Sequence, residues 1–315
     1  MRSLALLALA AVLLPAQPVN LIFDTDMGND IDDALALAVI HALESRGEAR
    51  LLAVTVTKDN KDAAPYIDLV NHFYHRPNIP IGIVHDGKTP KDAPMIAVPV
   101  ANPAYPRKLK NYKDAPEAVA LLEQTLKAQP DNSVTIVQVG FFTNLARLLD
   151  RPGAKDLIRR KVKLLSLMAG AFPKGKKEYN VYIDLPAANK VFAEWPTPIV
   201  TSGYEIGDAI RYPAVSIEND FKYVKNHPVA EAYRNYMKMP YDRQTWDLTA
   251  VLYAVRPNRG YFGLSENGTI TADAEGVTTH TPNPAARHQY LTVTPEQRTR
   301  VLEALVQLAS QPPAR

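Results

Sequence analysis

Five aspartates fall within ten positions at the start of the first helical pattern, in the segment DTDMGNDIDDALAL. Two of them, Asp32 and Asp33, could simply stabilise a helix N-terminus, where free N–H groups and the helix dipole favour carboxylates. That role does not account for the three aspartates upstream, Asp24, Asp26 and Asp30. Converging carboxylates repel one another unless a proton or a cation neutralises them, and Ca²⁺ and Mg²⁺ prefer oxygen ligands. The segment therefore predicts a site for a hard divalent cation.

Two other motifs with closely spaced aspartates fit this segment less well. An EF-hand loop has Gly at its sixth place and a bidentate Glu at its twelfth. Here Gly28 takes the fifth place and Leu35 the twelfth. Phosphoaspartyl enzymes also use an aspartate as nucleophile, but no later segment supplies the Lys and the acidic pair that such an enzyme needs.

Apolar runs rich in Val, Ile and Leu alternate with helical patterns along most of the chain. The expected strands are 19–23, 51–57, 79–84, 134–139, 162–168 and 197–202. The expected helices between them are 32–45, 64–74, 115–128, 143–150 and 184–195. This alternation predicts an α/β fold with an open, mostly parallel sheet flanked by helices on both faces. Such sheets bind ligands beyond the carboxyl ends of their strands, which is where the aspartates fall.

The last third of the chain departs from this alternation. Residues 205–245 lack strand runs and predict a helical flap or small insert. A buried helix is expected at 244–255, followed by β-like alternation over 267–294 and a final helix from Pro295. No repeat or linker interrupts the chain, so residues 18–315 are expected to form a single domain.

Residues 1–17 have the pattern of a secretory signal peptide. Arg2 precedes an apolar stretch from Leu4 to Leu14, and Ala16 is a small residue near its end. The stretch is too short to span a bilayer. We therefore expect a periplasmic or secreted protein with no membrane attachment after cleavage. The lack of cysteine fits export without disulfides, but it fits a cytosolic protein equally well.

Composition and charge favour a small-molecule ligand. A hydrophobic fraction of 46% over 315 residues is enough for a sizeable core. The net charge is only +3, and Lys and Arg are scattered along the chain. No basic stripe of the kind that binds nucleic acid is evident, so we expect no nucleic-acid partner.

Several segments together resemble the inosine-uridine-preferring nucleoside hydrolase family. The aspartate segment is similar to the family signature DxDPGxDDAxAL, with two extra residues and Met27 in place of Pro. Further similar segments follow in the family's order: DN (59–60), VGFFTNLARLL (139–149), MAG (168–170), EYNVYIDLPAA (178–188) and WDLTAVLYAV (246–255). Each is weak alone, but their order and spacing over nearly the whole mature chain are specific.

The resemblance implies a nucleoside hydrolase fold with a Ca²⁺ ion at the bottom of a ribose pocket. The implied metal ligands are Asp26, Asp33, the backbone carbonyl of Val139, and Asp247. Asp26 would also act as the general base toward water. The implied substrate-binding residues are Asp32, Asn60, Glu178, Asn180 and Trp246. Because the turn has two extra residues, either Asp30 or Asp32 could face the ribose, and Asp24 is expected to support the turn.

The function that this resemblance implies is calcium-dependent hydrolysis of the N-glycosidic bond of ribonucleosides, giving ribose and free base. A homo-oligomer, dimer or tetramer, is also implied. A rival from another class is a non-catalytic, calcium-dependent binding protein for ribosylated ligands. Base preference stays open, because Trp246 stands where purine-hydrolysing members have His. The candidates for a leaving-group acid are His227, Tyr233, Tyr241 and Arg243. We expect His41 near the surface, and the loop lysines Lys174, Lys176 and Lys177 in solvent.

Overall fold

The computed structural model describes residues 17–90 and 94–314. The expected signal peptide, residues 1–17, lies outside the described residues except for Gln17. Among the described residues, no helix is long and apolar enough to cross a membrane.

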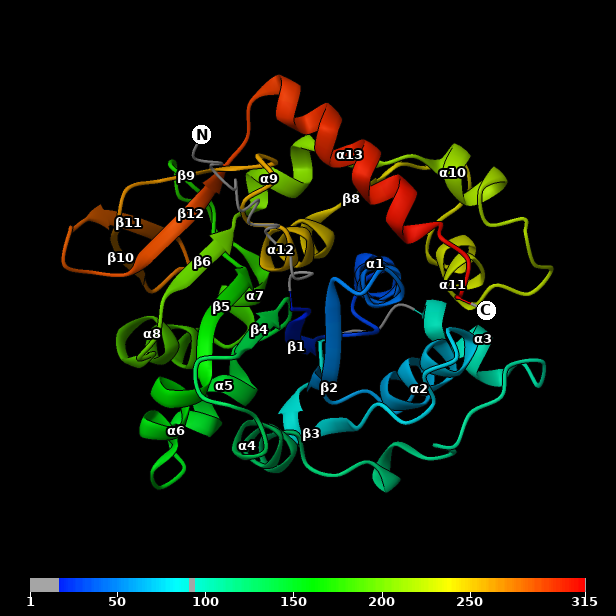
Figure 1. Ribbon diagram of the computed structural model, residues 1–315, viewed down its shortest axis with the longest axis horizontal. Coiled ribbons are helices and arrows are strands. Elements are labelled where there is room, and N and C mark those ends of the chain that lie inside the picture. The colour runs from blue at the N-terminus through cyan, green and yellow to red at the C-terminus, as the bar shows by residue number, and fades with distance from the viewer. Residues whose placement is uncertain (1–16, 91–93, 315) are drawn as a thin grey trace, which may run out of the picture.

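A ten-stranded sheet forms the centre of the described chain (Figure 1). Its strand order is β11-β10-β12-β6-β5-β4-β1-β2-β3, and β9 pairs with β12. The run from β12 to β3 is parallel, whereas β9, β10 and β11 pair antiparallel. The strands are β1 (Val19–Thr25), β2 (Ala49–Lys58), β3 (Ile81–Lys88), β4 (Val134–Gln138), β5 (Val162–Met168), β6 (Ile199–Ser202), β9 (Gly263–Leu264), β10 (Gly268–Ala272), β11 (Thr278–Pro282) and β12 (His288–Thr292). The open, mostly parallel sheet is confirmed.

Helices cover both faces of this sheet, as expected. One face carries α1 (Asp32–Ser45), α2 (Ala63–Phe73), α12 (Trp246–Val255) and α13 (Pro295–Ala309). The other carries α4 (Ala118–Lys127), α5 (Thr143–Leu149), α6 (Ala154–Lys161) and α8 (Leu185–Glu194). Two separate clusters of buried apolar side chains fill these layers. Shorter elements near the first layer are η1 (Pro94–Ile96), α3 (Ala97–Ala101) and η2 (Tyr112–Asp114).

The segment expected to be a helical flap contains strand as well as helix. Its helices are α9 (Tyr204–Ala209), α10 (Ala214–Asn219) and α11 (Pro228–Tyr236). Two short strands, β7 (Arg211–Tyr212) and β8 (Arg243–Gln244), pair with each other in antiparallel orientation. β7 follows α9, and β8 follows α11. Two-residue strands leave too short an apolar run to be recognised in a sequence. The β7–β8 pair matters because a single residue separates β8 from α12, which begins at Trp246.

The strand order places a ligand crevice between β1 and β4. The chain winds from β1 toward β2 and β3 on one side, and from β4 toward β5 and β6 on the other. In doubly wound sheets, ligands bind where this direction reverses. The two strand ends approach closely, because a Cβ added at Gly140 would meet the backbone nitrogen of Asp26 at 2.5 Å. Only glycine permits that approach.

His41 corrects one sequence expectation. We expected it near the surface, but its side chain is fully buried in α1. Its Nε2 lies 2.9 Å from Asn71 Oδ1, and its Nδ1 lies 3.2 Å from Glu44 Oε2. Glu44 lies one turn further along the same helix, but Asn71 comes from α2, and this distant partner is what allows the histidine to be buried.

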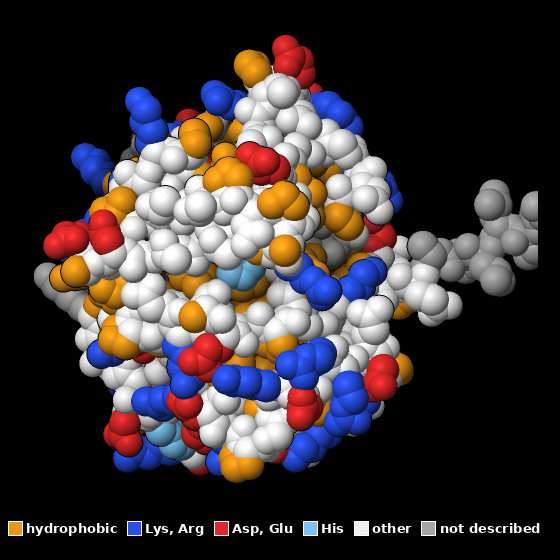
Figure 2. Space-filling view, turned by 90° about the vertical axis from the view of Figure 1, so that its left-hand side faces the viewer, with side chains coloured by type: hydrophobic (Ala, Val, Ile, Leu, Met, Phe, Trp, Pro, Cys, Tyr) orange, Lys and Arg blue, Asp and Glu red, His pale blue; other side chains and the backbone are white. Residues whose placement is uncertain are grey.

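The face shown in Figure 2 carries acidic and basic side chains close to one another. Apolar side chains are distributed between them and form no broad band. Some isolated apolar exposure of this kind is ordinary for a folded chain.

Candidate functional site

A cavity of about 460 Å³ lies at the carboxyl ends of the central strands. Nine residues were implied as site residues from the sequence, and seven of them line this cavity: Asp26, Asp32, Val139, Glu178, Asn180, Trp246 and Asp247. The other two, Asp33 and Asn60, are buried but do not line it. The fold therefore brings together residues from both ends of the chain.

The turn between β1 and α1 packs against Asn60 at Gly28. Gly28 has a φ of +101°, and a Cβ there would meet Asn60 Nδ2 at 2.6 Å. Glycine is therefore required both by the backbone conformation and by the close packing of Asn60. Asn60 itself accepts from the backbone N–H of Asp62 at 2.8 Å. Its observed contacts are with the turn and the start of α2, which is a supporting position.

Asp26 and Asp33 each have a buried oxygen, Oδ2, without a hydrogen-bond partner among the described residues. Asp33 accepts from the Thr25 hydroxyl through its other oxygen. Burial and the Asp26 carboxylate raise the pKa of Asp33. Burial and the Asp30 carboxylate raise the pKa of Asp26, whereas the Lys58 ammonium lowers it. Unsatisfied buried carboxylate oxygens are expensive, so this pair is suited to receive a cation.

Asp24 has the supporting role that the sequence suggested. Its Oδ1 accepts from Thr55 Oγ1 at 2.6 Å and from Asn144 Nδ2 at 2.8 Å. Burial raises the pKa of Asp24 to about 7, although both hydrogen bonds lower it. Asp24 thus ties β1 to β2 and α5 behind the cavity, which it does not line.

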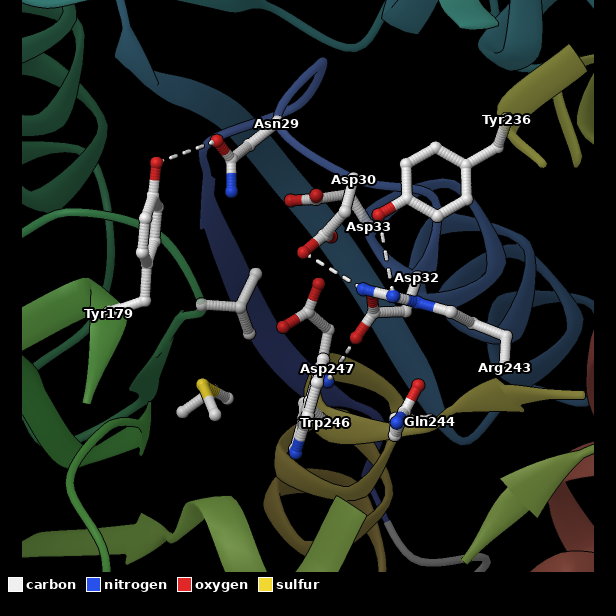
Figure 3. Close-up of polar contacts among 12 residues, drawn as sticks. Asn29, Asp30, Asp32, Asp33, Tyr179, Tyr236, Arg243, Gln244, Trp246 and Asp247 are labelled. Carbon is white, nitrogen blue, oxygen red and sulfur yellow. Dashed lines mark hydrogen bonds and ion pairs between the residues drawn. The ribbon is translucent and has the colours of Figure 1, made fainter. Parts of the chain in front are cut away.

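Asp30, Asp32 and Asp247 form a group in which one carboxylate oxygen from each residue lies within 4.8 Å of the other two (Figure 3). The Asp247 backbone N–H approaches Asp32 Oδ2 at 3.4 Å. Both Asp30 and Asp32 line the cavity, so the longer turn presents two carboxylates and not one. Sequence alone could not decide between them.

Glu178 and Asn180 are held by backbone groups on the opposite wall. Glu178 caps α7 (Tyr179–Ile183) and accepts from the N–H groups of Gly170, Asn180 and Val181. Asn180 donates through Nδ2 to the carbonyls of Val139 (2.8 Å) and Met168 (3.1 Å). The Val139 carbonyl, implied as a metal ligand, is therefore already a hydrogen-bond acceptor in this structure, with a second lone pair remaining.

Aromatic and basic side chains that the sequence did not nominate complete the cavity. Tyr179, Tyr204 and Tyr236 line it together with Lys176 and Lys177. Figure 3 shows Tyr179 on the opposite side of the aspartates from Tyr236. The two lysines were expected in solvent; they are exposed but also line the cavity. The loop that carries the two lysines lies directly before Glu178, and that position is the one sequence signal that could have placed them at the cavity.

Trp246 is fixed by a hydrogen bond and by packing. Its indole N–H donates to the Tyr204 carbonyl at 2.8 Å, and the two rings lie 5.3 Å apart. A Cβ at Gly207 would meet the Trp246 backbone nitrogen at 2.5 Å, so α9 approaches α12 closely at this point. The indole N–H is therefore occupied, and the ring itself is what Trp246 offers to a ligand.

Of the four candidates for a leaving-group acid, only Arg243 lines the cavity. Tyr233 and Tyr241 stack at 4.4 Å and donate to each other's backbone carbonyls. His227 is buried against Phe73 and Phe221 at ring distances of 4.5 and 4.7 Å. Burial lowers the pKa of His227 to about 3, so this imidazole is neutral at physiological pH.

His227 is expected to make the fold sensitive to acid. Its pKa is depressed in the folded state, so its contribution is present above pH 6.5 and is lost as pH falls through about 3. The loss should approach about 1.4 kcal/mol per pH unit within that window. Denaturant unfolding of His227→Gln between pH 7 and 4 should show a shallower decline than the natural chain. The exposed His85→Gln is the control, and an equal decline in both variants would contradict the assignment.

The fold and the site define an α/β protein with a carboxylate-lined ligand cavity at the strand-order reversal. The chain belongs to the family described as inosine-uridine preferring nucleoside hydrolase, whose model matches residues 21–306.

The family model matches most of the chain, whereas the sequence identity to individual relatives is low. The inosine-uridine preferring nucleoside hydrolase of Crithidia fasciculata is 29% identical over 208 residues, which cover 58% of this chain and 60% of that protein. The protein of the same name from Leishmania major is 27% identical over 299 residues, covering 85% and 90%. The solved plant nucleoside hydrolase PpNRh1 superposes with a TM-score of 0.72 at 20% identity, covering 94% of this chain and 100% of that one. This last likeness concerns the fold.

Proposed function

We propose that this chain hydrolyses the N-glycosidic bond of ribonucleosides, releasing ribose and the free base, with Ca²⁺ in the site. The observation that carries the proposal is the convergence of Asp26, Asp32 and Asp247 on one cavity. These residues come from the first and the last parts of the chain. Membership of the nucleoside hydrolase family supports the same reaction.

The donor set fits a hard cation. We assign its binding to Asp26, Asp33 and Asp247, with the Val139 carbonyl as a further ligand. The free Oδ2 atoms of Asp26 and Asp33 support this assignment, since every donor is an oxygen. When bound, Ca²⁺ supplies positive charge that favours ribose hydroxyls as ligands and makes a neighbouring water more acidic.

Asp26 is the residue that we assign as general base. Asp26 lines the cavity, and its buried Oδ2 has no hydrogen-bond partner among the described residues. Burial raises the pKa of Asp26, which makes its carboxylate a stronger base than a solvated one. Proton transfer from the attacking water to Asp26 then leaves hydroxide to attack the sugar.

The remaining polar residues hold the ribose and stabilise its developing positive charge. Asn180 uses its Nδ2 for two backbone carbonyls, which leaves Oδ1 available for a sugar hydroxyl. Asp32 and Glu178 supply carboxylates on opposite walls. Fixed negative and dipolar groups of this kind favour a transition state with oxocarbenium character. Asn60, which does not line the cavity, supports the turn in this scheme.

The leaving base receives no proton from Trp246, because an indole N–H is not acidic near neutral pH. We therefore expect nitrophenyl riboside, whose leaving group needs no protonation, to be hydrolysed about 100-fold faster than inosine or uridine. Trp246→His should raise the inosine rate more than the nitrophenyl riboside rate. Parallel kcat/KM measurements test this expectation. Equal rates on inosine and nitrophenyl riboside in the natural chain would mean that another group protonates the base.

The rival function is calcium-dependent binding of a ribosylated ligand without turnover. A reducing-sugar assay over a panel of nucleosides separates the two. Hydrolysis releases one ribose per base over many turnovers, whereas binding releases none. The position of Asp26 at the cavity favours turnover, because a binding site has no need for a general base there.

Two further properties are proposed from the sequence. The leader-like first 17 residues support export to the periplasm or the medium. The family resemblance supports a homo-oligomer. Sequencing the N-terminus of the mature protein tests export, and measuring the mass of the protein in solution tests the oligomeric state.

A further inference from the structure

Arg243 is a buried cation that lies directly among the carboxylates of the cavity. Its side chain is only 7% exposed. It donates to Asp32 Oδ1 through Nε at 3.0 Å and through Nη2 at 2.6 Å, and Nη2 also lies 2.9 Å from Asp30 Oδ2. The guanidinium carbon lies 5.1 Å from the centre of the Tyr236 ring and 5.0 Å from that of Trp246 (Figure 3). The Arg243 guanidinium is thus held by two carboxylates and lies near two aromatic rings.

The carboxylate that makes such a cation necessary is Asp30. It belongs to the two extra residues of the turn and lines the same cavity as Asp32. Burial and the Asp32 carboxylate raise the pKa of Asp30, and Arg243 lowers it. The Asp32 side chain is 1% exposed and that of Asp30 is 25% exposed, and two adjacent carboxylates so shielded from water stay ionised together only if positive charge lies beside them.

The contacts of Arg243 also orient Asp32. Both N–H donors bind the same oxygen, Oδ1, and the Asp247 backbone N–H approaches the other, Oδ2. The carboxylate is therefore fixed from two sides in a cavity where it would otherwise rotate. Two directed guanidinium donors hold a carboxylate oxygen more rigidly than a single ammonium can.

We propose that Arg243 is a positioning residue, a built-in counter-cation that fixes Asp32 and neutralises Asp30. The longer turn thereby becomes compatible with a divalent ion beside it. The inference rests on the proposed function for the ribose-binding role of Asp32, but the bridge between Asp30 and Arg243 is independent of any substrate.

The test compares Arg243→Met, Asp30→Asn and the double variant with the natural chain. Melting temperatures are measured in chelator and in calcium, and calcium affinity is measured by calorimetry with calcium alone. Arg243→Met should melt several degrees lower in chelator, because Asp30 and Asp32 lose their partner. Calcium should restore more of its stability than it adds to the natural chain. Adding Asp30→Asn should recover part of the loss in chelator.

Substrate kinetics give a second readout. If nitrophenyl riboside is hydrolysed, Arg243→Met should raise KM by at least about tenfold, because Asp32 is no longer held. Arg243→Lys should keep the calcium response of the natural chain but share the raised KM, since one ammonium cannot replace two directed donors. Arg211→Met is the matched control. Arg211 lies in β7, which pairs with β8, and its 52% exposed side chain contacts the exposed Asp208.

Additive effects of the Asp30 and Arg243 substitutions, with an unchanged calcium response, would overturn the proposal. Should Arg243→Met fail to fold, Arg243→Lys decides. A lysine variant with a calcium response unlike that of the natural chain would also overturn it. If the natural chain hydrolyses no riboside, the proposed function fails, but the coupling between residues 30 and 243 is still measured in chelator.

Discussion

Asp26→Asn is expected to lower kcat by about 10²- to 10⁴-fold, the usual contribution of a positioned general base. The amide keeps an oxygen for the cation but cannot accept a proton from water. Asn is close in shape to Asp, so the buried position should tolerate it. Affinity for ribose, measured as product inhibition, should change far less than kcat. That contrast between rate and binding identifies a group that acts in the transition state.

Two controls sharpen this measurement. Asp156→Asn changes an aspartate whose side chain is 77% exposed and should leave kcat unchanged. Calcium affinity of Asp26→Asn must be measured as well, because loss of the ion would also lower kcat. If kcat and ribose affinity fall equally, Asp26 is a ligand only. A full rate in Asp26→Asn would remove it from the mechanism.

Asp33→Ala is expected to abolish both calcium binding and activity. In the natural chain, calcium at one hundred times its Kd should stabilise the fold by about 2.7 kcal/mol. This corresponds to a rise in Tm on the order of 5 °C for a chain of this size. Asp33→Ala removes a buried carboxylate that we assign as a calcium ligand, so the Tm of this variant should be the same in calcium and in chelator. Its activity should be lost because the ribose hydroxyls lose the ion that holds them.

The exposed Asp156→Ala again serves as the control and should retain the calcium response. Titration with Mg²⁺ in parallel tests the identity of the ion, since Mg²⁺ demands a smaller and more regular shell. A natural chain whose Tm is the same in calcium and in chelator would count against a calcium site altogether. Activity of Asp33→Ala at the natural rate would exclude Asp33 as a ligand.

Much of the fold could be predicted because its signals are local. The helix α1 (Asp32–Ser45) and the strand β5 (Val162–Met168) have the bounds that the sequence indicated. Buried parallel strands are continuous apolar runs, and amphipathic helices repeat every three to four residues. The pair β7 and β8 was missed, since two residues carry no period.

The candidate site was predictable where its residues belong to motifs. Five of the seven implied residues that line the cavity follow β1, β4 or β5, whose ends meet at one edge of the sheet, whereas Trp246 and Asp247 begin α12. Tyr204 and Tyr236 were not predicted as site residues. The sequence pattern of a helix does not show whether a tyrosine faces a cavity or packs against a neighbouring side chain. His227 was nominated for its residue type alone, and its aromatic surroundings place it away from the cavity.

The sequence by itself determined the family, the alternation of strands and helices over residues 19–202, and the crowding of aspartates after β1. It left undecided whether Asp30 or Asp32 faces the site. Tertiary structure decided that both do, because Arg243 approaches Asp32 from 211 positions away and bridges the two carboxylates. Local patterns record which residues share a helix or a strand. Charge balance in a buried site depends on which distant segments meet there, and only the packed fold brings those segments together.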